Sequence, residues 1–261
     1  MAARIGDAGE AKRSSGIDVR VVGCGDAFGS GGRFNTCFLL DGPEGRALID
    51  CGASSLIALK ALGIDPDTIG TIAITHLHGD HFGGLVFLLR EATLYNRRTL
   101  PLLIAGPPGL RARLEQALEI FFPTGSAPPK TFALSFVELE ARATKQVGPI
   151  RITAFAADHF SGDPSYSLRV EMAGRTVAYT GDTLWVDDLE DLAAGADLLI
   201  CEAYSHERPR GKHLDYMTIK RRLPALGAAR LLLTHLGEEM IAMIPELDLP
   251  VAHDGQLIRL D

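Results

Sequence analysis

The chain has 261 residues, of which 46% are hydrophobic and 23% charged, and its net charge is -7. This length is enough for one large domain with a sizeable core. The acidic balance argues against nucleic acid as a partner, because nonspecific binding needs a surplus of Lys and Arg, and no apolar run is long enough for a transmembrane helix.

The N-terminal residues are small, polar and charged, and they lack the apolar stretch of a signal peptide. We expect a disordered leader over residues 1–16 and a single domain over residues 17–261. The cysteines match neither the spacing of a zinc ribbon nor a C-x-x-C pair. They are Cys24, Cys37, Cys51 and Cys201. Free thiols indicate a reducing compartment, so we expect a cytoplasmic protein without membrane contact.

Short apolar runs, many of them β-branched, dominate the first half of the domain. They predict strands at Val19–Val22, Cys37–Leu40, Ala47–Ile49, Thr71–Thr75 and Leu102–Ala105. Apolar residues at helical spacing, ended by Gly or Pro, indicate helices between these strands. The predicted helices are Ser54–Leu62, Gly84–Arg90 and Leu110–Phe122, followed by a loop rich in Pro and Gly over Pro123–Pro129.

The second half repeats this pattern. Its predicted strands are Ile150–Ala156, Tyr166–Met172, Thr176–Tyr179, Leu198–Cys201 and Leu231–Thr234. Helices are expected at Asp187–Ala194 and Thr218–Leu226, and Pro224 should kink or shorten the second of these. Two strand-rich halves that each carry helices predict two β-sheets packed face to face with helices outside. The expected fold class is therefore α/β, as a four-layer αβ/βα sandwich.

The most informative segment is Thr75–His81, with the sequence THLHGDH. It follows an apolar strand, and loops held by strands often carry catalytic groups. Imidazole and carboxylate suit zinc, manganese or iron. His76 and His78 can point to one ion, whereas Asp80 and His81 can face a second. The alternative, a solvated polar turn, is disfavoured because the whole chain has only eight His.

Three further residues, His159, Asp182 and His235, each follow a predicted strand, as the first cluster does. Any one of them alone could be a locally satisfied polar group. Their shared placement at the carboxyl ends of strands suggests that all three converge on the cluster.

This order of motifs resembles the metallo-β-lactamase superfamily: H-x-H-x-D-H, a lone His, Gly-Asp-Thr and Thr-His-Leu-Gly. The resemblance covers about Ile17 to Asp261. It implies the metallo-β-lactamase fold, two divalent metal ions, zinc or else manganese or iron, and hydrolysis by a metal-bridging hydroxide. It further implies that His76, His78 and His159 bind one ion, that Asp80, His81 and His235 bind the other, and that Asp182 bridges both. Asp50 would support the ligands from behind.

Within the superfamily, the motifs are most similar to ribonuclease Z and related phosphodiesterases. A carboxylate at Asp182 argues against the β-lactamases that carry Cys there. Gly79 lies between the ligands as in ribonuclease Z, and Cys201-Glu202-Ala203-Tyr204 followed by His213 resembles its His-Glu-Ala-Thr and His pattern. The resemblance makes His213 the donor of a proton to the leaving oxygen and Glu202 its support. The expected catalytic residues are thus Asp80, His213 and Glu202.

Two observations shape the expected substrate. The tRNA-binding arm of ribonuclease Z is absent, because only residues 160–180 separate the lone His from Gly-Asp-Thr. Basic residues surround His213 in sequence and could attract a phosphate. They are Arg208, Arg210, Lys212, Lys220, Arg221 and Arg222. A small or cyclic phosphodiester is therefore the expected small-molecule substrate.

Three alternatives stay open. His213 could be a surface residue beside Lys212. The protein could hydrolyse a thioester or lactone, which has less need of a proton donor, as glyoxalase II and quorum-quenching lactonases do. It could also be a non-catalytic metal-binding protein, although a complete ligand set argues against this. A homodimer is a further expectation, since similar phosphodiesterases are often dimers.

Overall fold

The computed structural model describes residues 16–123 and 130–261. The predicted leader, apart from Gly16, and residues 124–129 of the predicted Pro-rich loop lie outside the described residues. None of the helices within these two ranges is both long and apolar enough to span a bilayer.

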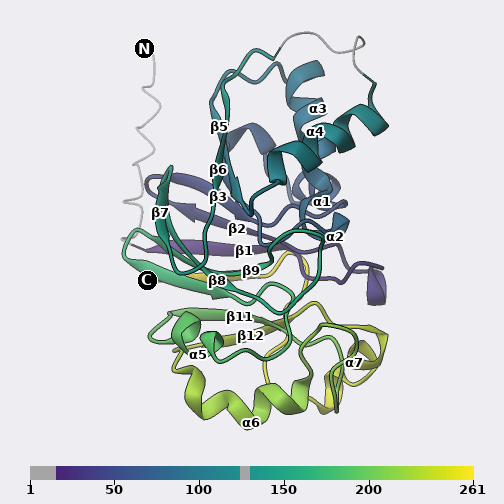
Figure 1. Ribbon diagram of the computed structural model, residues 1–261, viewed down its shortest axis with the longest axis vertical. Helices are drawn as coiled ribbons and strands as arrows, with labels where there is room; N and C mark the ends of the chain where they lie inside the picture. The colour runs from purple at the N-terminus through teal and green to yellow at the C-terminus, as the bar shows by residue number, and fades with distance from the viewer. Residues whose placement is uncertain (1–15, 124–129) are drawn as a thin grey trace, which may run out of the picture.

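Two sheets form the centre of the molecule (Figure 1). The seven-stranded sheet has the order β13-β1-β2-β3-β4-β5-β6. Its strands are β13 (Leu257–Leu260), β1 (Ile17–Gly23), β2 (Cys37–Gly42), β3 (Gly45–Ile49), β4 (Ile69–Ala73), β5 (Leu102–Gly106) and β6 (Leu134–Glu138). The six-stranded sheet has the order β12-β11-β10-β9-β8-β7. Its strands are β12 (Leu231–Thr234), β11 (Leu198–Glu202), β10 (Arg175–Tyr179), β9 (Tyr166–Met172), β8 (Ile150–Ala156) and β7 (Thr144–Val147).

The two sheets pack against each other through a shared apolar core. It joins inward-facing side chains of β1, β2 and β3 to those of β8, β9 and β10. Phe38 and Tyr179 meet edge to face across it, with ring centroids 5.3 Å apart. Alternation along each strand supplies this face, because successive side chains point to opposite sides of a sheet.

Helices cover the outer face of each sheet, as Figure 1 shows. The seven-stranded sheet is covered by α1 (Ser55–Ala61), α3 (Gly84–Leu94) and α4 (Leu110–Phe121), and the six-stranded sheet by α5 (Asp188–Ala193), α6 (Tyr216–Leu226) and α7 (Glu238–Ala242). Each set of helices forms its own apolar cluster with its sheet. The predicted four-layer αβ/βα sandwich is confirmed.

Some predicted elements differ from the structure. The strand expected over Thr71–Thr75 is β4, which ends at Ala73. Pro224 does not shorten α6, which begins two residues earlier than predicted and ends at Leu226. The earlier start has a physical cause: the Asp215 carboxylate accepts a hydrogen bond from the Thr218 amide and caps the helix. The strands β6, β7 and β13 and the helix α7 were not predicted.

Strand direction brings several strand ends to one edge. β3, β4 and β5 run parallel in the first sheet, and β10, β11 and β12 run parallel in the second. The two edges meet where the Tyr166 amide donates a hydrogen bond to the Thr75 carbonyl. Residues that follow β4, β10 and β12 therefore share this edge.

Candidate metal centre

The segment that follows β4 divides into a loop and a short helix. His76 and His78 lie in the loop, whereas Asp80 and His81 lie in α2 (Gly79–Phe82). The amide of His81 donates to the His78 carbonyl, so the helix begins directly after His78. The expectation of one continuous loop is corrected by this helical turn, which directs Asp80 and His81 toward a different group of residues.

The first group consists of His76, His78 and His159. Their candidate ligand atoms lie within 4.8 Å of one another. Nδ1 of His78 is 3.0 Å from Nε2 of His159. His76 is buried, His78 is partly open to solvent, and only 5% of the His159 side chain is exposed.

The second group consists of Asp80, His81, Asp182 and His235, all buried. Nε2 of His81 lies 3.1 Å from Asp80 Oδ2 and 3.3 Å from Asp182 Oδ2. Nε2 of His235 lies 3.4 Å from the same Asp182 oxygen. The structure thus brings together Asp80 and His235, which are 155 positions apart in the chain.

A single carboxylate oxygen joins the two groups. Oδ2 of Asp182 is 3.8 Å from Nε2 of His76 and 3.9 Å from Nε2 of His159, in the first group. It is also the oxygen that His81 and His235 face in the second group. This central position is what a bridging carboxylate requires.

Hydrogen bonds behind the site fix the orientation of His81 and His76. Nδ1 of His81 lies 2.7 Å from Asp50 Oδ2. The Thr75 hydroxyl donates to Asp50 and faces Nδ1 of His76 at 3.1 Å. Because these partners accept a hydrogen from each Nδ1, each Nε2 is left with its lone pair toward the centre.

His159 and His235 are oriented in the same way. Nδ1 of His159 lies 2.9 Å from the Lys212 carbonyl oxygen. Nδ1 of His235 lies 3.3 Å from the Thr36 hydroxyl, whose own hydrogen goes to the Gly25 carbonyl. Sequence reasoning missed Thr36, Thr75 and Lys212, because a hydroxyl or a backbone carbonyl behind a ligand leaves no pattern in the chain.

The backbone that carries these residues is unusual. Asp50 and His235 have φ angles of 57° and 56°, a left-handed conformation that L-residues adopt only at a cost. Gly52 is required for a different reason: a Cβ atom there would lie 2.1 Å from the Asp80 carbonyl oxygen. The Asp50-Cys51-Gly52 motif therefore places both a carboxylate and a close backbone approach beside α2.

The electrostatics suit metal ligation, which needs neutral imidazoles and ionised carboxylates. Burial lowers the pKa of His76, His78, His159 and His235. Burial alone would raise the pKa of Asp80 and Asp182, but the neighbouring imidazoles lower both.

His81 is the exception. Burial opposes its charge, but Asp182, Asp80 and Asp50 raise its pKa well above the ordinary value. Three carboxylates around one imidazole concentrate negative charge that a cation would neutralise.

Unpartnered buried atoms give an independent test of whether metal ions fit. Nε2 of His76, Nε2 of His81 and Oδ1 of Asp182 are buried without a hydrogen-bond partner among the described residues. Buried polar atoms are otherwise almost always paired. The two imidazole nitrogens face Asp182 at the centre of the groups, so the donor set fits divalent metal ions.

Glu202 and His213 lie beside this centre. Glu202 ends β11 and is fully buried, and it accepts hydrogen bonds from the amides of Thr183 and Leu214. Its Oε2 is 2.9 Å from Nδ1 of His213, which is also 3.6 Å from Asp182 Oδ2. Burial, followed by the charge of Asp182, raises the pKa of Glu202 to about 7.

His213 is not an isolated surface residue, because only a fifth of its side chain is exposed. Burial lowers its pKa, but the bond to Glu202 and the charges of Glu202 and Asp182 outweigh this and raise it to about 9. His213 and Glu202 also form a third group of candidate ligands with Asp182 and His235. Within that group the short bond between His213 and Glu202 favours a proton-carrying pair over two metal ligands.

Three of the six basic residues near His213 are paired with carboxylates. Arg210 pairs with Glu239, Lys212 with Asp158 and Lys220 with Asp248. Arg222 lies over the ring of Trp185. These pairs offset the charge of half of the predicted positive patch, and the attraction of phosphate by this segment stays a prediction.

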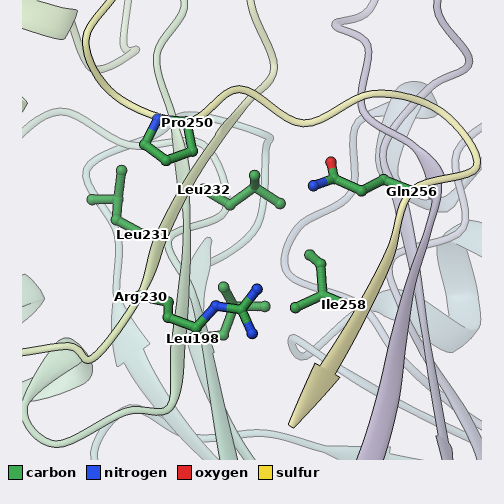
Figure 2. A pocket seen from close by; sticks show the side chains of 7 residues that line it. All are labelled: Leu198, Arg230, Leu231, Leu232, Pro250, Gln256 and Ile258. Carbon is green, nitrogen blue, oxygen red and sulfur yellow. The ribbon is translucent and has the colours of Figure 1, made fainter.

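A separate pocket of about 230 Å³ lies between the edge strands of the two sheets (Figure 2). Leu198 and Leu231 line it from the starts of β11 and β12, with Ile258 of β13 opposite. The candidate metal centre instead follows strand ends. None of its residues lines this pocket.

Comparison with known proteins agrees with this geometry. Ribonuclease Z from Mycolicibacterium gilvum is 30% identical over 199 residues, covering 70% of this chain and 68% of that protein. The crystal structure of human tRNase Z, short form, has a TM-score of 0.75 and 26% identity and covers 92% of this chain and 98% of that one. The metallo-β-lactamase fold protein YhfI from Bacillus subtilis has a TM-score of 0.75 and 22% identity and covers 94% and 100%.

The family described as "Anti-Pycsar protein Apyc1" matches residues 17–248. The match includes every residue of the two ligand groups and every strand of both sheets except β13. Together with the ribonuclease Z homologues, it confirms the resemblance drawn from the motifs. The chain therefore belongs to the Apyc1 anti-Pycsar family of ribonuclease Z-like proteins in the metallo-β-lactamase superfamily.

Proposed function

We propose that the protein is a dinuclear metal-dependent phosphodiesterase that acts on a small or cyclic phosphodiester. The observation that carries this proposal is the Glu202–His213 pair beside Asp182. An alkoxide leaving group needs a proton donor, whereas a thioester or lactone hydrolase has less need of one. Transfer RNA is not the proposed substrate. The segment where ribonuclease Z carries its tRNA-binding arm is taken up in this chain by β9, the turn at Ala173–Gly174 and β10.

His76, His78 and His159 would hold one ion, Asp80, His81 and His235 the other, and Asp182 both. Two bound divalent cations, zinc, manganese or iron, lower the pKa of a shared water and neutralise charge on the substrate. The chain's own contribution is to hold His76, His81, His159 and His235 with Nε2 inward and to keep the carboxylates ionised. Asp80, the less buried carboxylate of the second group, stays a proposed catalytic residue as well as a ligand.

The proposed proton path runs through one imidazole. Glu202 holds Nδ1 of His213, and no hydrogen bond among the described residues occupies Nε2. With its pKa raised to about 9, His213 carries a proton at neutral pH. It can give that proton to the leaving oxygen, while Glu202 stabilises the charged ring.

The test is to measure kcat/KM of metal-loaded protein on two phosphodiesters. One has a poor alkoxide leaving group, and the other, bis-p-nitrophenyl phosphate, has a good leaving group. His213→Ala should slow the poor substrate by about 10²–10⁴-fold and barely affect the activated one, because p-nitrophenolate leaves without a proton. Glu202→Gln should show the same pattern more weakly. Metal content should be unchanged in both variants.

Three results would count against the proposal. Equal losses on both substrates would mean that His213 serves binding or structure. No loss on either would make His213 a bystander. Wild-type protein that hydrolyses a thioester or lactone but neither phosphodiester would establish the alternative function.

The proposed location of the protein is the cytoplasm, because its four cysteines are buried free thiols.

We also propose a homodimer through the apolar surface of α1, α3 and α4. Large apolar side chains are exposed on this surface, as is usual at protein interfaces. They are Ile57, Phe87, Tyr95, Ile120 and Phe121. Sedimentation velocity should give a dimer for the wild type and a monomer for Phe87→Glu; a monomeric wild type would contradict the proposal.

A further inference from the structure

The imidazole of His213 lies against the ring of Tyr204. The two rings are stacked, with centroids 4.7 Å apart and planes at 30°. The rings of His235 and His159 are farther away, at 5.5 Å and 5.0 Å. Glu202 provides the one hydrogen bond of His213 among the described residues. A single hydrogen bond fixes one atom of the imidazole but leaves rotation about that bond open.

Tyr204 is itself held in place by its backbone. Its amide donates to the Leu214 carbonyl, and its carbonyl accepts from the Gly237 amide at 3.1 Å. The ring also lies close to Gly237, where an added Cβ would be 3.2 Å from Cε2 of Tyr204. The Tyr204 ring is therefore held in one position between Gly237 and His213.

The hydroxyl of Tyr204 does not contribute to this arrangement. No hydrogen bond within residues 16–123 and 130–261 uses it, and the side chain is only half-buried. The ring rather than the hydroxyl makes the contact with His213. A ring without the hydroxyl should do the same.

We propose that Tyr204 is a positioning residue whose ring holds the His213 imidazole in the plane from which it donates a proton. The inference rests on the proposed function, because it takes His213 to be the general acid. It goes beyond the resemblance, since the ribonuclease Z pattern has Thr where this chain has Tyr204. Proton transfer depends on hydrogen-bond reach to the leaving oxygen, so a ring that limits rotation of the imidazole raises the rate.

The kinetic test compares Tyr204→Leu and Tyr204→Phe on the two phosphodiesters. Tyr204→Leu should lower kcat/KM for the poor leaving group about tenfold, the scale of one aromatic pair, and leave bis-p-nitrophenyl phosphate nearly unchanged. Tyr204→Phe should match the wild type on both. An equal loss for Leu and Phe would assign the effect to the hydroxyl, and an equal loss on both substrates would assign it to binding or structure. Either result would overturn the proposal.

A double-mutant cycle shows whether Tyr204 acts through His213. In a His213→Ala background, Tyr204→Leu should cause no further loss on the poor leaving group, because the group that it positions is gone. A full additional loss would overturn the proposal. Phe28→Leu is the matched control: Phe28 lines a recess of about 200 Å³ together with Tyr204 but has no ring contact with His213. This variant should leave the ratio of the two rates unchanged.

A spectroscopic measurement separates this inference from the proposed function. The full-length protein is labelled with ¹³C-histidine, and the His213 signal is identified by its loss in His213→Ala. Wild type and Tyr204→Phe should show an upfield ring-current shift and slow-tumbling relaxation of the His213 ring. Tyr204→Leu should lose the shift and show faster ring motion. An equally ordered His213 in Tyr204→Leu would overturn the proposal, whatever reaction the protein catalyses.

Discussion

The two ligand groups differ in how far they are buried and how firmly they are supported. All four residues of the second group, Asp80, His81, Asp182 and His235, are buried, whereas His78 of the first is partly open to solvent. Among the imidazoles of the two groups, only that of His81 is bonded to a carboxylate outside the groups. Its Nδ1 lies 2.7 Å from Asp50 Oδ2. The first group depends on a hydroxyl and a backbone carbonyl.

Because of this difference, we expect the two groups to bind their metal ions with different affinities. A carboxylate behind an imidazole raises its basicity and strengthens metal binding, and burial limits exchange with water. We expect the second group to bind its ion more tightly. The more open first group is then the side from which substrate approaches.

The largest expected effect removes the residue common to both groups. Asp182→Ala should lower affinity for the second ion by more than about 100-fold, since even a supporting residue is worth about 10–100-fold. Activity should be lost while the fold persists, because the core between the sheets is untouched. Mass spectrometry of the native protein and circular dichroism check this. Two retained ions per chain would contradict the bridging role.

The next effect targets Asp50, which reaches His76 of the first group only through the Thr75 hydroxyl but bonds directly to His81 of the second group. Asp50→Asn should lower affinity at that group about 10–100-fold, because the amide cannot supply the negative charge behind His81. Calorimetric titration of apo protein should show the step of the second group weakened more than the step of the first group, which Asp50 reaches only through Thr75. Asp41→Asn, near the end of β2 where Asp41 pairs with Arg46, is the control and should change neither step. If both steps weakened equally, the two groups would not be separate sites.

Chelation tests the comparison without mutation. The first group should release its ion at a chelator concentration about tenfold lower than the second, the lower end of the effect of a supporting carboxylate. With ¹³C-histidine labelling, the signals of His78 and His159 should move before those of His81 and His235. The reverse order would mean that exposure and support do not set affinity here.

The smallest effect concerns Thr36. Its contact with His235 is long, at 3.3 Å, and a neutral hydrogen bond is worth only about 0.5–1.5 kcal/mol. Thr36→Val should therefore lower affinity at the second group by less than about tenfold. Thr153→Val, on the exposed side of β8, is the control. A loss as large as that of Asp50→Asn would show that the hydroxyl has a greater role than its geometry indicates.

Much of the architecture could be predicted because apolar runs in this chain mark strands well. β8, β9 and β12 have the predicted bounds. β13 was missed because it is short and its pairing with β1 joins opposite ends of the chain. α2 was missed because its single turn shows no helical repeat of apolar residues.

The candidate site was predictable where it depends on residue type and order. The THLHGDH segment and the His and Asp residues after later strands are visible as letters in the chain. Thr36, the Lys212 carbonyl and the ring of Tyr204 were not, because their importance arises from contacts made only after folding. The same holds for the basic residues near His213, whose charge is offset by carboxylates distant in sequence.

The most direct test of two ligand groups is a crystal structure of zinc-loaded protein with data collected at the zinc absorption edge. We predict two anomalous peaks, one at His76, His78 and His159 and one at Asp80, His81 and His235. Asp182 should lie between them, and ligand distances should be about 2.0–2.2 Å. A single peak would contradict the account, as would a zinc ion bound by Glu202 and His213, because His213 would then be a ligand and not a proton donor.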